Sequence, residues 1–167
     1  RLDSRGRHVY ESSIVSSDDA VFFLGRSDGA RFVGIVSANA MSPFHGTTED
    51  ITVTVRPVYL DSQSDFFEKR FVFGYLVRIE NHSQHDVQLL RRFWRIQEHT
   101  GRVQEVEGEG VIGKQPIIPP SGIHQYSSYS VLASFEGTMG GYYTMERPSG
   151  ERFRVTIPEF DLRAHAN

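Results

Sequence analysis

The sequence of 167 residues contains no cysteine. This absence excludes disulfide bonds, thiolate zinc sites, iron–sulfur ligation and a cysteine nucleophile. No apolar run approaches the roughly 18 residues of a membrane-spanning helix, and helical periodicity never lasts beyond one turn. The formal net charge of -3 gives no overall attraction to nucleic acid or to an anionic membrane. These absences leave a globular chain whose partners have to be inferred from local motifs.

The chain is instead rich in aromatic residues, which make up 12% of it and favour β structure. From residue 51 onward, apolar and polar residues alternate in short runs separated by glycine, proline or polar turns. The run RFVFGYLVRIEN places five side chains on one face, namely Phe71, Phe73, Tyr75, Val77 and Ile79. About seven such strands predict an all-β fold, an immunoglobulin- or fibronectin type III-like β-sandwich.

Residues 1–46 are polar and contain one organised stretch, VFFLGRSDGARFVGIV. Its two apolar runs flank turn residues at positions 25–29, which predicts a β-hairpin. Residues 37–50 have the composition of a linker. We therefore expect two parts: an N-terminal arm and linker over residues 1–46, and the sandwich domain over residues 47–167.

Residues 108–113 read GEGVIG, the G-x-G-x-x-G pattern that can bind the pyrophosphate of a dinucleotide. That function requires a helix after the glycines, whose N–H groups face the phosphates. The residues that follow, KQPIIPPSG, contain three prolines that would break such a helix, and no βαβ unit surrounds the motif. A Rossmann-type dinucleotide site is therefore not expected.

Two interpretations of the glycines remain. In the favoured one, they shape a loop between two sheets by adopting positive φ or allowing close backbone approach. In the alternative, backbone N–H groups form a nest that binds phosphate or pyrophosphate weakly, without chemistry. The residues of this possible anion loop are Gly108, Gly110, Gly113 and Lys114.

The run RRFWR mixes basic and aromatic residues, as nucleic-acid-binding strands do. On a strand, neighbouring side chains point to opposite faces. One face then carries the expected core tryptophan and its neighbours, Leu90, Arg92, Trp94 and Ile96. The other carries a solvated outer row that is also a possible docking stripe for RNA or an acidic partner: Arg91, Phe93 and Arg95.

No catalytic or metal-binding set is expected. The NHSQHD segment could suggest a metal clip, but a polar turn is favoured because no further ligand converges on His82, His85 and Asp86. The serines at positions 127, 128 and 130 lie in a strand without a nucleophile elbow. The glutamates at 105, 107 and 109 are expected to form an acidic rim beside the glycine loop. We expect no enzyme activity, no metal and no cofactor.

Six blocks in order resemble the ApaG domain family over about residues 51–162: the strand ending IEN, VQLLRRFWRI, VEGEGVIGKQP, YSSYSVL, GTMGGYYTM and FRVTIPEFDL. The family's G-x-G-x-x-G falls on Gly108, Gly110 and Gly113. The resemblance implies an immunoglobulin- or fibronectin-like sandwich without a secure catalytic activity. It also implies a protein-interaction role, as in the ApaG domains of F-box proteins and of a polymerase-delta-interacting protein. The arm favours a eukaryotic or organellar member over the stand-alone bacterial form, which the resemblance links loosely to cobalt and magnesium resistance.

The function expected from these observations is that of a non-catalytic protein-interaction module within a multi-subunit assembly. Two alternatives are a weak phosphate, pyrophosphate or nucleotide-binding domain using the GEGVIG loop, and a structural subunit of an organellar ribonucleoprotein complex, in which Arg91 and Arg95 could contact RNA. No membrane contact is expected. An intracellular and preferably mitochondrial location is expected, since a cleaved targeting segment would explain a start without methionine; a disordered tail would explain it too.

Overall fold

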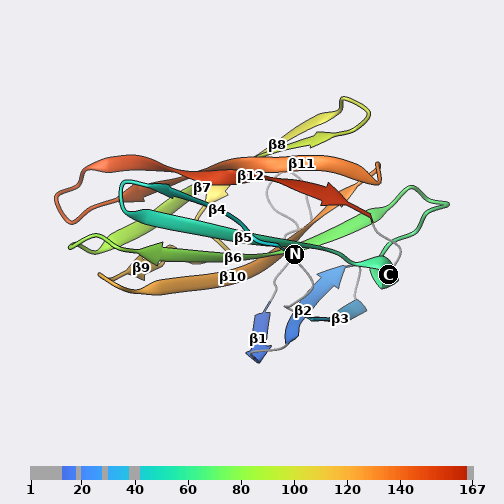
Figure 1. Cartoon of the computed structure of the whole chain (residues 1–167), viewed down its shortest axis with the longest axis horizontal. Coiled ribbons are helices and arrows are strands. Elements are labelled where there is room, and N and C mark those ends of the chain that lie inside the picture. The colour runs from blue at the N-terminus through green and yellow to red at the C-terminus, as the bar shows by residue number, and fades with distance from the viewer. Residues whose placement is uncertain (1–12, 18–19, 28–29, 38–41, 165–167) are drawn as a thin grey trace.

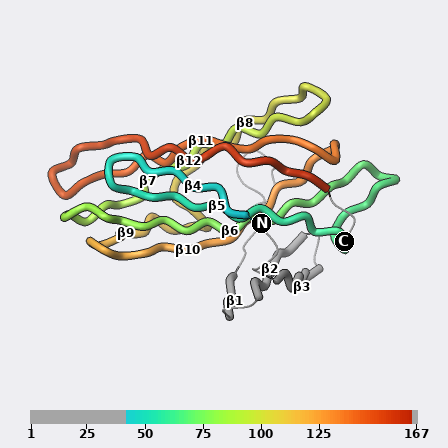
Figure 2. Tube along the Cα trace, viewed as in Figure 1, coloured from blue at the N-terminus to red at the C-terminus, as the bar shows by residue number. Residues whose placement is uncertain are grey.

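The structure is a computed structural model that describes residues 13–17, 20–27, 30–37 and 42–164. Within these ranges the chain forms antiparallel strands and one short 3-10 helix, Asp61–Gln63, with no α-helix. From residue 42 onward the strands form two facing sheets (Figure 1; Figure 2). The all-β prediction is therefore confirmed.

The first sheet has the strand order β10-β6-β5-β4. Its members are β4 (Phe44–Thr48), β5 (Ile51–Tyr59), β6 (Phe71–Asn81) and β10 (Ile123–Leu132). Strands β4, β5 and β6 follow one another as a meander, whereas β10 returns to pair with β6 only after the chain has visited the second sheet.

The second sheet has the order β12-β11-β7-β8, and β9 also pairs with β7. Its members are β7 (Val87–Glu98), β8 (Val103–Glu109), β9 (Ile117–Ile118), β11 (Glu136–Glu146) and β12 (Arg152–Arg163). The chain crosses between the sheets after β6, before β10 and after β10. This arrangement is an immunoglobulin-like β-sandwich, as predicted.

The core lies between the sheets and centres on Trp94 of β7, which is 3% exposed. Its ring contacts those of Tyr75 and Phe160, with centroids 5.3 and 6.0 Å away. The inward face predicted for β6 is also confirmed, because all five of its members are buried: Phe71, Phe73, Tyr75, Val77 and Ile79. Aromatic packing thus joins both sheets at the centre of the sandwich.

One expected core position is wrong. The alternation predicts Leu90 on the inward face with Trp94, but Leu89 is the fully buried residue and Leu90 is only partly buried. The register between β11 and β7 shifts between Thr144 and Met145, so one residue of β7 is unpaired there. Such a bulge reverses the alternation of the residues beyond it.

The N-terminal hairpin is confirmed: β2 (Ala20–Ser27) pairs antiparallel with β3 (Ala30–Ser37). Positions 28 and 29 of the expected turn lie outside the described residues. A further strand that the sequence did not predict, β1 (Ser13–Ser17), pairs with β2. Strand β4 begins within the expected linker, three residues before the expected boundary, while the division into arm and domain stays a prediction.

We expect Trp94→Ala to lower the free energy of unfolding by about 3–5 kcal/mol, because it leaves a cavity between two sheets that cannot easily close. Urea unfolding of the full chain measures the change. Ile117→Ala removes an apolar side chain that is 61% exposed and should cost no more than about 0.5 kcal/mol. Equal effects of the two substitutions would show that Trp94 is not the centre of the core.

Candidate functional site

The glycine loop follows β8 and leads to β9. Gly110 and Gly113 have φ of 60° and 70°, in the left-handed region that favours glycine, and Ile112 between them also lies there, with φ of 47°. A Cβ on Gly110 would lie 2.1 Å from the carbonyl oxygen of Lys114, whereas a Cβ on Gly113 would meet nothing within 4 Å. Since β8 and β9 both pair with β7, the loop connects strands of one sheet and not two sheets as expected.

Several N–H groups of the loop already bond within the protein. The Gly110 N–H donates to the carbonyl of Leu90 (2.8 Å), and Val111 and Lys114 exchange N–H···O bonds of 2.8 and 3.1 Å. These donors would have to be released before they could contact an anion. Binding of phosphate or pyrophosphate by the loop stays a prediction.

The loop instead presents carbonyl groups to a cation. Arg92 of β7 is partly buried, and its Nη1 donates to the carbonyls of Glu109 (3.0 Å) and Gly110 (2.8 Å). The guanidinium also lies against Gly108, where a Cβ would be 3.1 Å from both Nη1 and Nη2. The glycine-rich loop is therefore a cradle for an arginine side chain. The alternation along the strand predicts Arg92 on the same face as Trp94, but no sequence motif marks it as a site residue.

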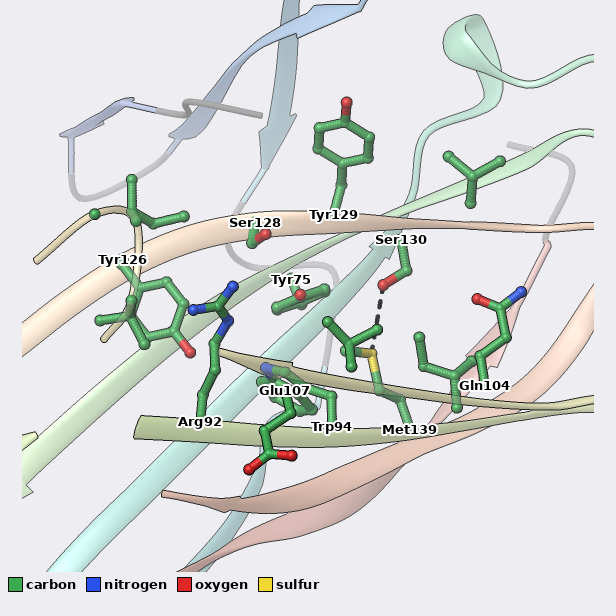
Figure 3. A pocket seen from close by; sticks show the side chains of 16 residues that line it. Tyr75, Arg92, Trp94, Gln104, Glu107, Tyr126, Ser128, Tyr129, Ser130 and Met139 are labelled. Atoms are coloured by element: carbon green, nitrogen blue, oxygen red, sulfur yellow. Dashed lines mark hydrogen bonds between the residues drawn. The ribbon is translucent and has the colours of Figure 1, made fainter. Parts of the chain in front are cut away.

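A pocket of about 380 Å³ opens between edge strands β8 and β10, beside this arginine. Figure 3 shows Arg92 rising from β7 toward β10, with Tyr126 beside it and Tyr75 behind. The apolar part of the lining comes mainly from Trp94, Ile96, Val106, Val111 and Met139. The polar part comes mainly from Arg92, Gln104, Tyr126, Ser128 and Ser130. An apolar cavity with a few convergent polar groups is the usual form of a ligand site.

The tyrosines of this region are neutral hydroxyl groups. Burial raises the pKa of Tyr75, and hydrogen bonds with Ser128 and Ser130 oppose that rise. Burial also raises the pKa of Tyr126 and of Tyr143, whose hydroxyls bond to each other across the two sheets. Near neutral pH these hydroxyls can therefore donate or accept hydrogen bonds but cannot supply a negative charge.

The possible docking stripe, Arg91, Phe93 and Arg95, lies on the outer face of β7 as expected. In the register of β7 and β8, these residues face the three glutamates expected at an acidic rim: Glu109, Glu107 and Glu105. Arg91 is 3.3 Å from Glu107, and the Phe93 ring stacks on that of Tyr142. The neighbouring acids offset the basic charge, and contact of this stripe with RNA or an acidic partner stays a prediction.

The NHSQHD segment forms the turn between β6 and β7, and Asn81 organises it. Asn81 is fully buried, and its Nδ2 donates to the carbonyls of His85 (2.7 Å) and Ile118 (2.9 Å). Its Oδ1 accepts from the N–H of Ser83. Over the described ranges, no three histidine, aspartate or glutamate side chains converge as metal ligands.

A second surface feature has no counterpart in the sequence analysis. Phe66, Phe67 and Phe135, here called the aromatic tip, are 73%, 94% and 50% exposed. Their rings continue from the buried Phe71, which lies edge-on to Phe66 at 6.2 Å and to Phe135 at 6.4 Å. The β5–β6 connection that carries two of them extends from the end of the sandwich opposite β9 (Figure 1; Figure 2).

Comparison with known proteins gives consistent matches. The family model described as the ApaG domain matches residues 61–147. Protein ApaG from Sinorhizobium fredii is 46% identical over 119 residues, or 71% of this chain and 92% of that protein. Protein ApaG from Paramagnetospirillum magneticum is 48% identical over 116 residues, covering 70% and 89%. A crystal structure of a Bordetella pertussis protein aligns with a TM-score of 0.68 and 41% identity over 71% of this chain and 96% of that one.

These relatives are bacterial, so they give no support to the expected eukaryotic or organellar membership or to a mitochondrial location. Their names specify no reaction, ligand or partner. In the part of the chain that the structure describes, no helix is long and apolar enough to cross a membrane.

We expect Gly113→Ala to lower the free energy of unfolding by about 1–2 kcal/mol, the cost of left-handed backbone for a residue with a Cβ. Gly110→Ala should cost about 3 kcal/mol or more, because its Cβ would also displace the Lys114 carbonyl. Urea unfolding of both variants measures the difference. Equal losses would mean that contact with the Lys114 backbone does not determine the loop.

The stability of the protein should fall in acid partly through His124 of β10. Burial and the charge of Lys114 lower the pKa of this imidazole, whereas the same group in the unfolded chain titrates near pH 6.5. The unfolded state therefore binds the proton more readily, and the stabilisation present above about pH 6.5 is lost as pH falls through the folded pKa.

Urea unfolding at pH 7.5 and pH 5.0 tests this pH dependence. His124→Gln should lose less stability between the two conditions than the wild type does. Gln125→Ala, which changes an exposed residue of the same strand that does not titrate, should lose as much as the wild type. An unchanged pH dependence in His124→Gln would contradict the assignment.

Proposed function

Because this chain belongs to the ApaG domain family, we propose that it is a non-catalytic domain of a larger assembly that binds another protein through the aromatic tip. The observation that carries the proposal is the outward position of two adjacent phenylalanines on an ordered turn. Large exposed apolar side chains gathered in one place are typical of interaction surfaces. Aromatic residues are also the ones most enriched at the energetic centres of protein interfaces.

The turn that holds Phe66 and Phe67 is built by hydrogen bonds. Asp65 and Arg70 exchange backbone N–H···O bonds of 2.7 and 2.8 Å. The Asp65 carboxylate accepts from the N–H groups of Phe67 and Glu68, both at 3.0 Å. The two aromatic rings are thus presented by a backbone that is already ordered, which lowers the entropy cost of docking.

The surroundings of the tip also match an interface. Glu68, Lys69 and Arg70 follow the two phenylalanines and are exposed, so charged residues border the apolar pair. Apolar centres with polar rims are the usual anatomy of protein interfaces. The partner that fits this surface is a protein with an apolar groove able to accept two adjacent aromatic side chains.

The proposal is tested by photo-cross-linking of the full chain in its native host cells. A photoreactive phenylalanine analogue at position 67 should give one defined protein adduct. The same analogue at position 117, also exposed but at the other end of the sandwich, should not. Phe66→Ser should reduce the adduct formed from position 67 by about tenfold, as expected for loss of an interface anchor.

The control for folding is the melting temperature. Phe66→Ser and Phe67→Ser alter exposed side chains, so each should change stability by no more than about 0.5 kcal/mol. Adducts of equal yield from positions 67 and 117, or none from position 67, would contradict docking through the aromatic tip.

A further inference from the structure

The pocket between β8 and β10 contains a charge that the described protein does not neutralise. Nη1 of Arg92 is bonded to two carbonyls, whereas Nη2 and Nε have no hydrogen bond to a described residue. Within residues 42–164, no carboxylate lies at ion-pair distance from this guanidinium. Glu107 at the pocket margin pairs instead with Arg91, 3.3 Å away on the outer face.

We infer that this pocket binds a small organic anion, with its carboxylate on Arg92 and its apolar body on the wall formed around Trp94. This site is separate from the aromatic tip and does not depend on the function proposed for the tip. It is also distinct from an anion nest, because the ligand would contact an arginine side chain and not the N–H groups of the glycine loop.

The charge of the site favours a single carboxylate. A guanidinium with two nitrogen atoms still able to donate can bind both oxygens of one carboxylate. Tyr75, Ser128 and the other hydroxyls nearby are neutral donors that add hydrogen bonds without adding charge. One arginine balances a monoanion, whereas a phosphate or pyrophosphate group would bring more negative charge than the pocket compensates.

The remainder of the pocket favours an apolar body on the ligand. Trp94, Val106 and Met139 line it, and Val106 is the most exposed of the three, since Trp94 and Met139 are buried. The volume of about 380 Å³ is at the lower end of the range found for small-molecule sites. A ligand with one aromatic or branched aliphatic group would therefore fit better than a simple inorganic ion.

The two carbonyl groups that bond to Arg92 explain how its guanidinium can be ordered and still keep its charge for a ligand. Bonds from Nη1 to Glu109 and Gly110 fix the guanidinium at the mouth of the pocket without cancelling its charge, because carbonyl groups are neutral. An aspartate or glutamate in the same place would fix the side chain but would also neutralise it. The arrangement thus orders the arginine before a ligand arrives, which favours binding.

NMR titration of the 167-residue chain with 3-phenylpropionate tests the inference. We expect saturable shifts of backbone amides around Arg92, Val106 and Ser128. The neutral isostere 3-phenylpropionamide should bind about tenfold more weakly or worse, because it lacks the charge that pairs with arginine. Inorganic phosphate should also bind about tenfold more weakly, because it has no apolar body.

Substitutions separate this site from other sources of the shifts. Arg92→Gln should weaken binding of 3-phenylpropionate about tenfold or more, whereas Arg163→Gln, at an exposed position on β12, should leave it unchanged. If Arg92→Gln does not fold, binding of 3-phenylpropionate to Val106→Phe tests the site instead, because this substitution fills the pocket and keeps the arginine. Loss of binding in that variant supports the site.

Four results would overturn the inference. These are no saturable shift up to about 10 mM, equal affinity for the acid and its amide, undiminished binding by folded Arg92→Gln, and undiminished binding by Val106→Phe. Shifts by phosphate centred on residues 108–114 would instead support an anion site in the glycine loop.

Discussion

The alternation of side chains along β7 is the constraint on which both the core and the candidate site depend. This strand pairs with β8, β9 and β11, so its orientation is fixed from both sides. Trp94 and Ile96 then point into the sandwich, and Arg92 must point the same way two residues earlier. A charged side chain on an inward face needs polar partners, and the carbonyls of the glycine loop supply them. The core and the pocket therefore share one strand and one register.

The GEGVIG motif has a structural role here that differs from the phosphate binding that its sequence pattern suggests. In nucleotide-binding folds the glycines bring N–H groups to a phosphate at the start of a helix. Here the motif ends an edge strand, and the groups that it directs at a neighbour are carbonyl oxygens. The three glycines have different roles: Gly108 leaves room for the guanidinium, Gly110 for the Lys114 carbonyl, and Gly113 allows left-handed backbone. In this fold the G-x-G-x-x-G sequence therefore favours binding of a cation of the protein itself, the Arg92 guanidinium.

Local alternation was enough to predict the strands and the inward residues of β6, because a period of two fixes the face of every side chain on an unbroken strand. It failed at Leu90, where a bulge in the pairing of β7 with β11 reverses the alternation of inward and outward side chains. It also missed β4, whose five residues are mostly small or polar. The pocket could not be predicted at all, since Val106, Ser128 and Arg92 come together only through the crossing of the chain between sheets. The aromatic tip could not be predicted either, because Phe66 and Phe67 lie in one connection between strands and Phe135 in another.

The three glutamates of β8 have a further consequence, which concerns the behaviour of the protein in concentrated solution. Among the described residues, strand β8 is the last strand of its sheet, and its outer backbone edge could add a strand from a second copy. Such pairing would bring two rows of carboxylates together, Glu105, Glu107 and Glu109 from each copy, all of them exposed. Electrostatic repulsion between the rows opposes edge-to-edge growth into fibrils, and it weakens when salt is added or the carboxylates are protonated.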